Sequence, residues 1–345
     1  MELESLEMLT DEIFPALSLD GTLLVEAVMN GDIDAMVSMI LEATIQALRS
    51  PLVNTKELLV SMLLIGIAAT LCKQFSLLVL DEGAQKLSFW IIYILLIKQL
   101  LELYYVGQAV VVESLESMVL FGNVFVPVFT VVLTAAAGSV TSAGYVATLV
   151  LVVYIVQNML LLLLIPCVEG YALLVLLGSL GIRDRMEKLL EFFEKGFSLV
   201  FKVIFFAVFS IGGLQSMLLP FLGSAQTGVA KKVISMVPAV GDVAEGTFEI
   251  VTGAAILVKN GIGVIGIIVL FLLVLSPVVK LGILCVTIKI VAVVFDMLGE
   301  KQMMWCTDKM AYAHVFLLKV TAMSVSLLLL WIMLAVYTTN QRLLF

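Results

Sequence analysis

Five ionisable side chains lie within long apolar stretches of this sequence and are its first candidates for chemistry: Lys98, Glu102, Glu169, Lys289 and Asp296. A central, unpaired charge in a hydrocarbon layer costs on the order of 3 kcal/mol. Charges kept at that cost would line an aqueous path or a contact between subunits. The alternative is that they pair within a helical bundle or reach the interface from helix ends.

Two spacings favour pairing. Lys98 and Glu102 are four residues apart and share one helical face, where they can neutralise each other within a bundle. Lys289 lies about mid-span and seven residues before Asp296, two turns along the same face, and a structural pair and a functional contact fit equally well. Snorkelling from the ends of apolar runs explains three further lysines: Lys202, Lys280 and Lys319.

Two short motifs invite an enzymatic interpretation, and both are better explained otherwise. Gly261-x-Gly263-x-x-Gly266 matches the dinucleotide fingerprint in letters, but it begins an apolar run and follows no strand of a βαβ unit. Small residues for close helix packing account for it better. Val240-Gly241-Asp242 resembles an intramembrane aspartyl protease motif, but Ala239 replaces the required glycine, and paired catalytic carboxylates must share a site.

Other catalytic or metal chemistry finds little support. His314 is the single histidine, and a lone histidine at a helix start is more often an interfacial residue than a metal ligand or a base. No Walker A sequence is present, so any energy source would belong to another subunit. The four cysteines form no Cys-x-x-Cys pair, and because three of them lie in apolar segments, buried small hydrophobes are expected rather than ligands or disulfides. The sequence predicts a non-enzymatic protein with no cofactor and no metal.

The composition is typical of a membrane protein. Hydrophobic residues make up 62% of the 345 residues and charged residues 13%, with a mean hydropathy of +1.18. The net charge is −8, and acids are concentrated in Met1–Glu57. No basic patch or aromatic groove suggests nucleic acid. We expect an acidic amphipathic region at residues 1–57, divided into short helices by Pro15, Asn30-Gly31 and Pro51, and a polytopic transmembrane domain at residues 58–345.

The fold is predicted to be all-α, with seven or eight membrane-spanning helices. The 52 residues from Ser117 to Val168 contain no Asp, Glu, Lys or Arg, which is enough for two spans with a turn near Gly138. Another 20 uncharged residues run from Asn260 to Val279, and Pro277 interrupts the run, which predicts a helical hairpin. The expected spans are Leu58–Leu80, Leu87–Val106, Val119–Ala137, Gly144–Ile165, Val203–Leu222, Asn260–Val279 and Val315–Tyr337, with Cys167–Leu180 re-entrant or a short crossing.

Two segments between spans are predicted outside the hydrocarbon layer. Arg183–Lys195 carries four bases, four acids and an apolar stripe at helical spacing, so residues 181–196 are predicted to be an interfacial amphipathic helix. Its bases form the densest positive cluster of the chain and place it on the cytoplasmic side. Residues 223–259 form a connection punctuated by Pro and Gly. Residues 1–57 lack the basic start and adjoining apolar core of a signal peptide.

The segment Met236–Leu270 resembles the C-terminal half of the stage III sporulation protein AE family of spore-forming bacteria. The order of spans from about Leu58 onward is also similar, although members of the family typically begin with a signal peptide. The residues that carry the resemblance include Pro238, Gly241 and Asp242, the run Val251-Thr252-Gly253-Ala254-Ala255, and the Lys-Asn-x-x-Gly-x-x-Gly pattern of Lys259, Asn260, Gly263 and Gly266.

The resemblance implies the large polytopic component of a channel-like complex between mother cell and engulfed forespore, in the mother-cell-derived membrane. The implied partners are the lipid bilayer, other stage III sporulation membrane proteins, a cytoplasmic ATPase and extracytoplasmic ring-forming proteins. No catalytic residues follow from it. We expect a non-enzymatic membrane subunit required for late forespore development. The alternatives are a permease subunit for a small molecule, stand-alone or coupled to a separate ATPase, and a structural anchor that conducts nothing.

Overall fold

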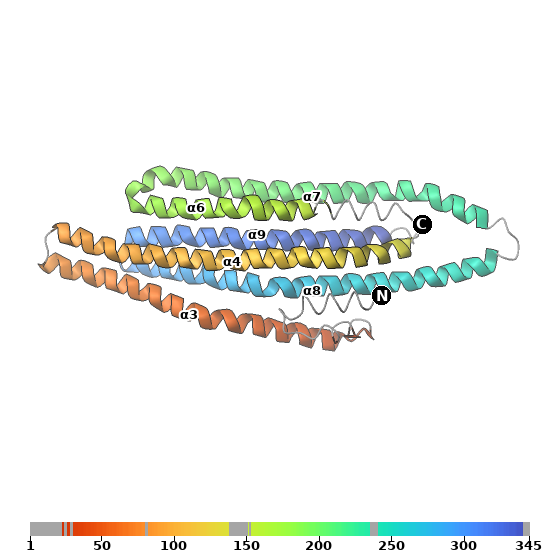
Figure 1. The fold of residues 1–345 in the computed structure, drawn as a ribbon, viewed down its shortest axis with the longest axis horizontal. Coiled ribbons are helices and arrows are strands. Elements are labelled where there is room, and N and C mark those ends of the chain that lie inside the picture. Colours follow the sequence, from red (N-terminus) through yellow and green to blue (C-terminus); the bar gives the residue numbers. More distant parts are fainter. Residues whose placement is uncertain are drawn as a thin grey trace.

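The protein is a long bundle of helices that run nearly parallel to one another (Figure 1). The computed structural model describes residues 30–79, 82–137, 153–234 and 241–340, together with Leu23, Glu26, Ala27 and Leu151. The predicted all-α fold is confirmed over these residues. The elements are α3 (Ile33–Val79), α4 (Glu82–Ala137), η2 (Leu160–Leu164), α6 (Ile165–Leu177), η3 (Gly178–Ile182), α7 (Arg183–Ile234), α8 (Gly241–Met297) and α9 (Lys301–Asn340).

Within the described ranges, four helical stretches are long and apolar enough to cross a membrane: Lys86–Asn123, Val153–Leu180, Gly261–Met297 and Lys301–Met333. Leu59–Cys72 is a shorter apolar helix. Large apolar side chains also cover the outside of the bundle; Leu162 is 77% exposed and Phe206 72%. Such a surface is typical of a protein that contacts lipid. The fold is that of a polytopic helical membrane protein, and the count of seven or eight spans stays a prediction.

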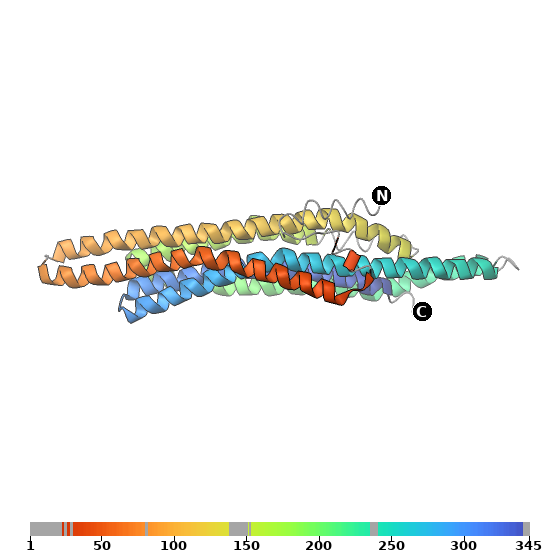
Figure 2. The same cartoon turned by 90° about the horizontal axis from the view of Figure 1, so that it is seen from below.

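Helix α9 lies at the centre of the bundle. It packs most extensively against α8 and also contacts α4, α6 and α7, whereas α3 packs against α8 and α4. At one end of the bundle, α3 and α4 extend beyond the turn between α8 and α9 (Figures 1 and 2). At the opposite end, α7 and α8 extend beyond α4 and α9. All the helices therefore lie alongside one another over only part of their lengths.

The helices are longer than the sequence pattern predicts. Helix α8 continues through Pro277, so the hairpin predicted there is wrong. The chain instead turns at Gly299, whose φ of +76° is readily adopted only by glycine. A proline removes one backbone hydrogen bond of a helix, and the side chains on both sides of Pro277, such as Leu273 and Leu281, are buried in the bundle. Packing therefore outweighs the local preference.

Two other predicted breaks are also wrong. The predicted spans Leu87–Val106 and Val119–Ala137 belong to one continuous helix, α4, on which the intervening Glu113 and Glu116 are exposed. Helix α3 likewise runs through Pro51. The break at Asn30-Gly31 is confirmed: Gly31 has a φ of +69°, and the Asp32 carboxylate accepts a hydrogen bond from the Ala35 N–H at 3.1 Å, capping α3.

A proline explains the wider π-turn that precedes α6. Pro166 lies at the start of α6 and cannot donate a backbone hydrogen bond, and the preceding turn, η2, is π-helical. A second π-turn, η3, connects α6 to α7. The segment Arg183–Lys195 forms the first turns of α7, which continues to Ile234. The turn expected near Gly138 lies outside the described residues.

Aromatic packing fills one part of the core. Phe121, Phe125 and Phe129 stack along α4, with ring centroids 5.0 and 5.2 Å apart, and Trp331 of α9 meets the last two edge-on. Gly266 of α8 closes against this stack: a Cβ atom there would lie 2.3 Å from the Phe125 ring. The glycine is therefore needed for close approach of α8 and α4, as small residues are in membrane helix packing.

We predict that Gly266→Ala lowers stability by about 1–3 kcal/mol, because the new methyl group overpacks a ring that its stacked neighbours hold in place. The matched control is Gly282→Ala on the same helix, where a Cβ would meet nothing within 4 Å. Removing backbone freedom there should leave stability unchanged or raise it by up to about 1 kcal/mol. Thermal unfolding of both variants in detergent checks this; equal midpoints would contradict the close approach.

Candidate functional site: a charged network on α7, α8 and α9

The main polar feature of the described residues is a group of charged and aromatic side chains that joins four helices. Lys289 of α8 forms an ion pair with Asp308 of α9, through Nζ and Oδ1. The two side chains are 40% and 36% exposed, so the pair lies at the surface of the bundle. The pairing partner of Lys289 is thus Asp308, and not Asp296, which is exposed at the C-terminal end of α8.

A second ion pair lies one residue further along α9. Lys309 donates to Glu194 of α7 at 2.9 Å, and the side chains are 16% and 26% exposed. The Tyr171 hydroxyl of α6 donates to the same Glu194 oxygen at 2.8 Å. One carboxylate therefore holds α6, α7 and α9 together. Because the pair is largely withdrawn from water, losing either partner leaves a poorly solvated charge.

The ring of Tyr312 connects the two ion pairs. The Lys289 ammonium lies 4.2 Å from its centroid and the Lys309 ammonium 5.4 Å. Both distances are within the range of cation–π attraction. We call the six residues the charged network: Tyr171, Glu194, Lys289, Asp308, Lys309 and Tyr312. Its ions are paired, so its chemistry is electrostatic attachment between helices.

Only Lys289 of this network stands out in the sequence. Glu194 belongs to a charge-rich segment and Asp308-Lys309 to a polar link, and both patterns predict solvated surface. Their pairing depends on α7 and α9 lying side by side, which a single sequence does not encode at short range. The one available signal is the charge complementarity between these two polar segments.

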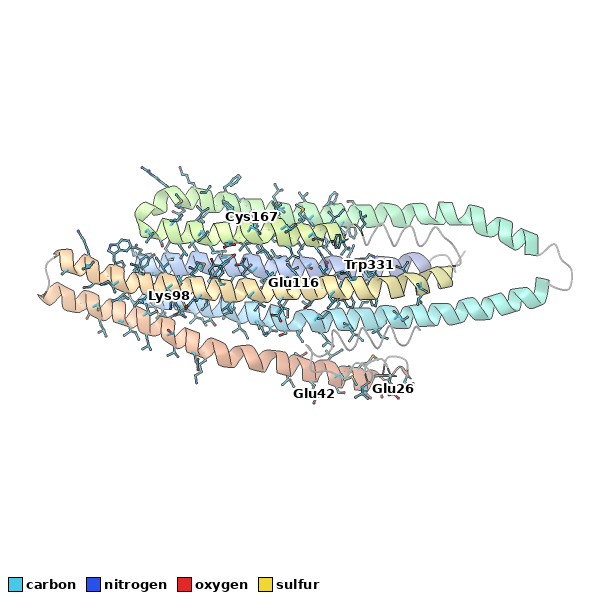
Figure 3. The ribbon with its side chains drawn as sticks, in the orientation of Figure 1. Glu26, Glu42, Lys98, Glu116, Cys167 and Trp331 are labelled. Carbon is cyan, nitrogen blue, oxygen red and sulfur yellow. The ribbon has the colours of Figure 1, made fainter. Side chains whose placement is uncertain are left out.

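The other candidate residues lie apart from the charged network. Lys98 and Glu102 form an ion pair at 3.1 Å on α4, with side chains 69% and 53% exposed, so they face outward and not into the bundle. Figure 3 shows Lys98 and Glu116 along α4. Glu169 is partly buried on α6. None of these residues is brought into the charged network.

His314 is fully buried, so the prediction that it is interfacial is wrong. Its Nδ1 lies 3.1 Å from the Met310 carbonyl oxygen, and its Nε2 lies 3.2 Å from the Leu103 carbonyl oxygen of α4. Gly107 allows this approach, because a Cβ there would lie 3.1 Å from the imidazole. The imidazole thus fastens α9 to α4. In the part of the chain that the structure describes, no group of three or more His, Cys, Asp or Glu side chains is placed to hold a metal ion.

The residues of the family-like motif between Pro238 and Gly266 lie in different surroundings. Pro238 lies outside the described residues. Gly241, Asp242, Lys259 and Asn260 are all part of α8, and Gly263 is buried. Gly266 makes the close contact with Phe125 described above. Gly263 and Gly266 thus both lie on the packed side of α8.

Long apolar helices, with large apolar side chains exposed on the outside of the bundle, define the class of polytopic membrane proteins. The family model named Stage III sporulation protein AE matches residues 19–339, and the chain belongs to this family. It is 20% identical over 323 residues to stage III sporulation protein AE of Bacillus subtilis (strain 168), covering 91% of this chain and 79% of that protein. No solved structure matches the chain.

We predict that Lys309→Met destabilises the protein by about 1–3 kcal/mol, because it strands the Glu194 carboxylate in a poorly hydrated position. The matched control, Lys98→Met, breaks an exposed pair and should cost no more than about 1 kcal/mol. In thermal unfolding, adding Glu194→Gln to Lys309→Met should recover part of the loss. Equal effects of the two single substitutions would contradict the interhelical role of Lys309.

Proposed function

We propose that this protein is a non-enzymatic core membrane subunit of a sporulation-specific, channel-like or secretion-like complex between mother cell and forespore, required for late forespore development. It resides in the mother-cell-derived membrane around the forespore as a multi-pass protein. Its partners are other stage III sporulation membrane proteins, a cytoplasmic ATPase and extracytoplasmic ring-forming proteins.

The observation that carries the proposal is the extent of the family match. Residues 19–339 include every helix with described bounds apart from the last residue of α9, so the whole bundle, and not one motif, is what the family shares. A sporulation role follows from membership in the family. The place in the complex is our inference from the resemblance of the Met236–Leu270 segment and from the membrane character of the bundle.

The packing of the core favours a subunit that anchors other subunits over a small-molecule permease. A permease needs polar groups that face a cavity near the middle of the membrane. Here the charged network is paired, and the core between α4, α8 and α9 is filled by Phe121, Phe125, Phe129 and Trp331. Aromatic residues packed in this way hold helices rigidly together, which is what a subunit that anchors other subunits requires.

The first test is deletion of the gene in a spore-forming host, with complementation by the intact gene as control. Forespore size and late forespore gene expression are followed by microscopy after engulfment. The proposal predicts arrest after engulfment with shrunken forespores. Normal spores together with a growth or uptake defect in vegetative cells would contradict it and favour the permease.

We predict that Lys289→Leu reduces spore formation at least about tenfold with normal protein levels, because the half-exposed Lys289 ammonium lies at the surface of the bundle, where a partner subunit can contact it. The control is Lys86→Leu, the same change at an exposed lysine of α4. If Lys289 serves only to neutralise Asp308, the double variant Lys289→Leu/Asp308→Leu restores sporulation. Restoration, or full sporulation of the single variant, would eliminate the functional contact.

A further inference from the structure

The long uncharged stretches of five helical segments begin or end at one common level of the bundle. Helix α3 is the exception, because its uncharged stretch Leu59–Cys72 lies beside Phe295 of α8 through Gly66. Lys280 precedes Lys289 by nine residues on α8, and Lys319 follows Asp308 by eleven residues on the antiparallel α9. The Lys289–Asp308 pair therefore places Lys280 and Lys319 at nearly the same level along the bundle axis. Phe197 of α7 stacks on Phe316 of α9 at 4.5 Å. Lys202, five residues beyond Phe197, therefore lies at that level too, within about one helical turn.

Helix α4 and the segment that contains α6 show the same alignment. Met118 of α4 accepts a hydrogen bond from Ser324 of α9, so the uncharged stretch that follows Glu116 begins within about a turn of Lys319. Gln157 donates to Ser324 at 3.5 Å, and Tyr171 of α6 meets Phe316 at 5.2 Å between ring centroids. Glu169, where the uncharged stretch ends, thus lies near the same level.

We call the aligned stretches the apolar belt: residues 117–137 of α4, 153–168, 203–222 of α7, 260–279 of α8 and 320–339 of α9. None contains Asp, Glu, Lys or Arg. Twenty helical residues extend about 30 Å, which equals the thickness of the hydrocarbon core of a bilayer. The five aligned stretches therefore give the bundle one uncharged level of membrane thickness.

Exposed charges separate the rest of the bundle from the belt, whereas large exposed apolar side chains such as Leu87, Phe192 and Met297 occur outside the belt as well. Side chains exposed at the level of the belt are apolar almost throughout, for example Val131 at 60%, Leu162 at 77%, Phe206 at 72% and Met333 at 57%. On the other side of the level of Lys202, exposed charges are frequent: Lys86, Lys98, Glu102, Arg185, Lys188, Glu191, Lys195, Asp296 and Lys301. In Figure 3, Lys98, Glu116 and Trp331 follow one another from the charged half into the belt.

We infer that the acyl chains of the bilayer surround the apolar belt, and that the charged network and the Lys98–Glu102 pair lie outside the hydrocarbon on one side of the membrane. Lys202, Lys280 and Lys319 mark the boundary and extend to the headgroups. Helix α3 passes the belt with Asp34 and Glu42 exposed. Since carboxylates are costly in hydrocarbon, the acyl chains meet the bundle over the other helices, and α3 borders water or protein.

Cysteine labelling tests the inference directly. In a variant with Cys72, Cys167, Cys285 and Cys306 replaced by Ser, Phe192→Cys and Phe206→Cys are compared. Both phenylalanines lie on α7 and are equally exposed, at 71% and 72%, but they are 14 residues apart, and only Phe206 is in the belt. The full chain is expressed in a host that does not sporulate, and vesicles opened by freeze–thaw are treated with a water-soluble maleimide.

The thiol introduced by Phe192→Cys is expected to react at least about tenfold faster in vesicles than the thiol introduced by Phe206→Cys, because maleimide attack needs a hydrated thiolate. Both variants should react fully in dodecyl sulfate. Equal rates, or faster reaction at position 206, would overturn the inference. If a phenylalanine variant fails to enter the membrane fraction, Leu87→Cys outside the belt and Leu162→Cys inside it form the second pair. Because the assay needs no sporulation, its failure is distinct from failure of the proposed function.

Discussion

The structure depends on the axial alignment of α9 against its neighbours. One helix carries the contacts that fix four others: His314 to α4, Ser324 to Gln157, Lys309 to Glu194 of α7, and Asp308 to Lys289 of α8. Long apolar helices can slide along one another at little cost when only methyl groups touch. Polar contacts at defined positions remove this freedom, because a shift of one turn would leave each group without its partner. The few polar residues on α9 therefore specify the bundle more than their number suggests.

The same alignment gives the charged network its place. A charge buried in hydrocarbon is expensive, and pairing recovers only part of the cost. The half-exposed positions of Lys289 and Asp308, and the outward position of Lys98 and Glu102, are difficult to explain at the centre of a bilayer. They are readily explained at one end of the bundle, beside the start of α7 with its alternating bases and acids. In the function that we propose, this surface is available to other subunits. The aromatic stack around Trp331, which follows Asp308 by 23 residues on α9, supplies rigidity toward the other end of the bundle.

The sequence predicts the helical class, the membrane character and the family, because these follow from hydrophobic runs and from a segment of specific residues. It predicts helix ends less well. Glu113 and Glu116 suggest a gap between two spans, yet they lie exposed on one continuous helix, and Pro277 suggests a turn, yet packing carries α8 through it. The pairing of Lys289 with Asp308, and of Lys309 with Glu194, could not be predicted, since each joins residues whose proximity depends on which helices are neighbours. The small residues around position 266 predict close helix packing, but the partner of Gly266, Phe125, emerges only from the fold.

The alignment of α9 is tested most directly by cryo-electron microscopy of the protein in a lipid nanodisc. We expect a map in which Phe125 lies against Trp331, Glu194 against Lys309 and Lys289 against Asp308, with the lipid disc around the half of the bundle that contains Trp331. A map in which α9 is displaced by a turn or more along α4 and α7, or in which the disc surrounds the turn between α3 and α4, would contradict it.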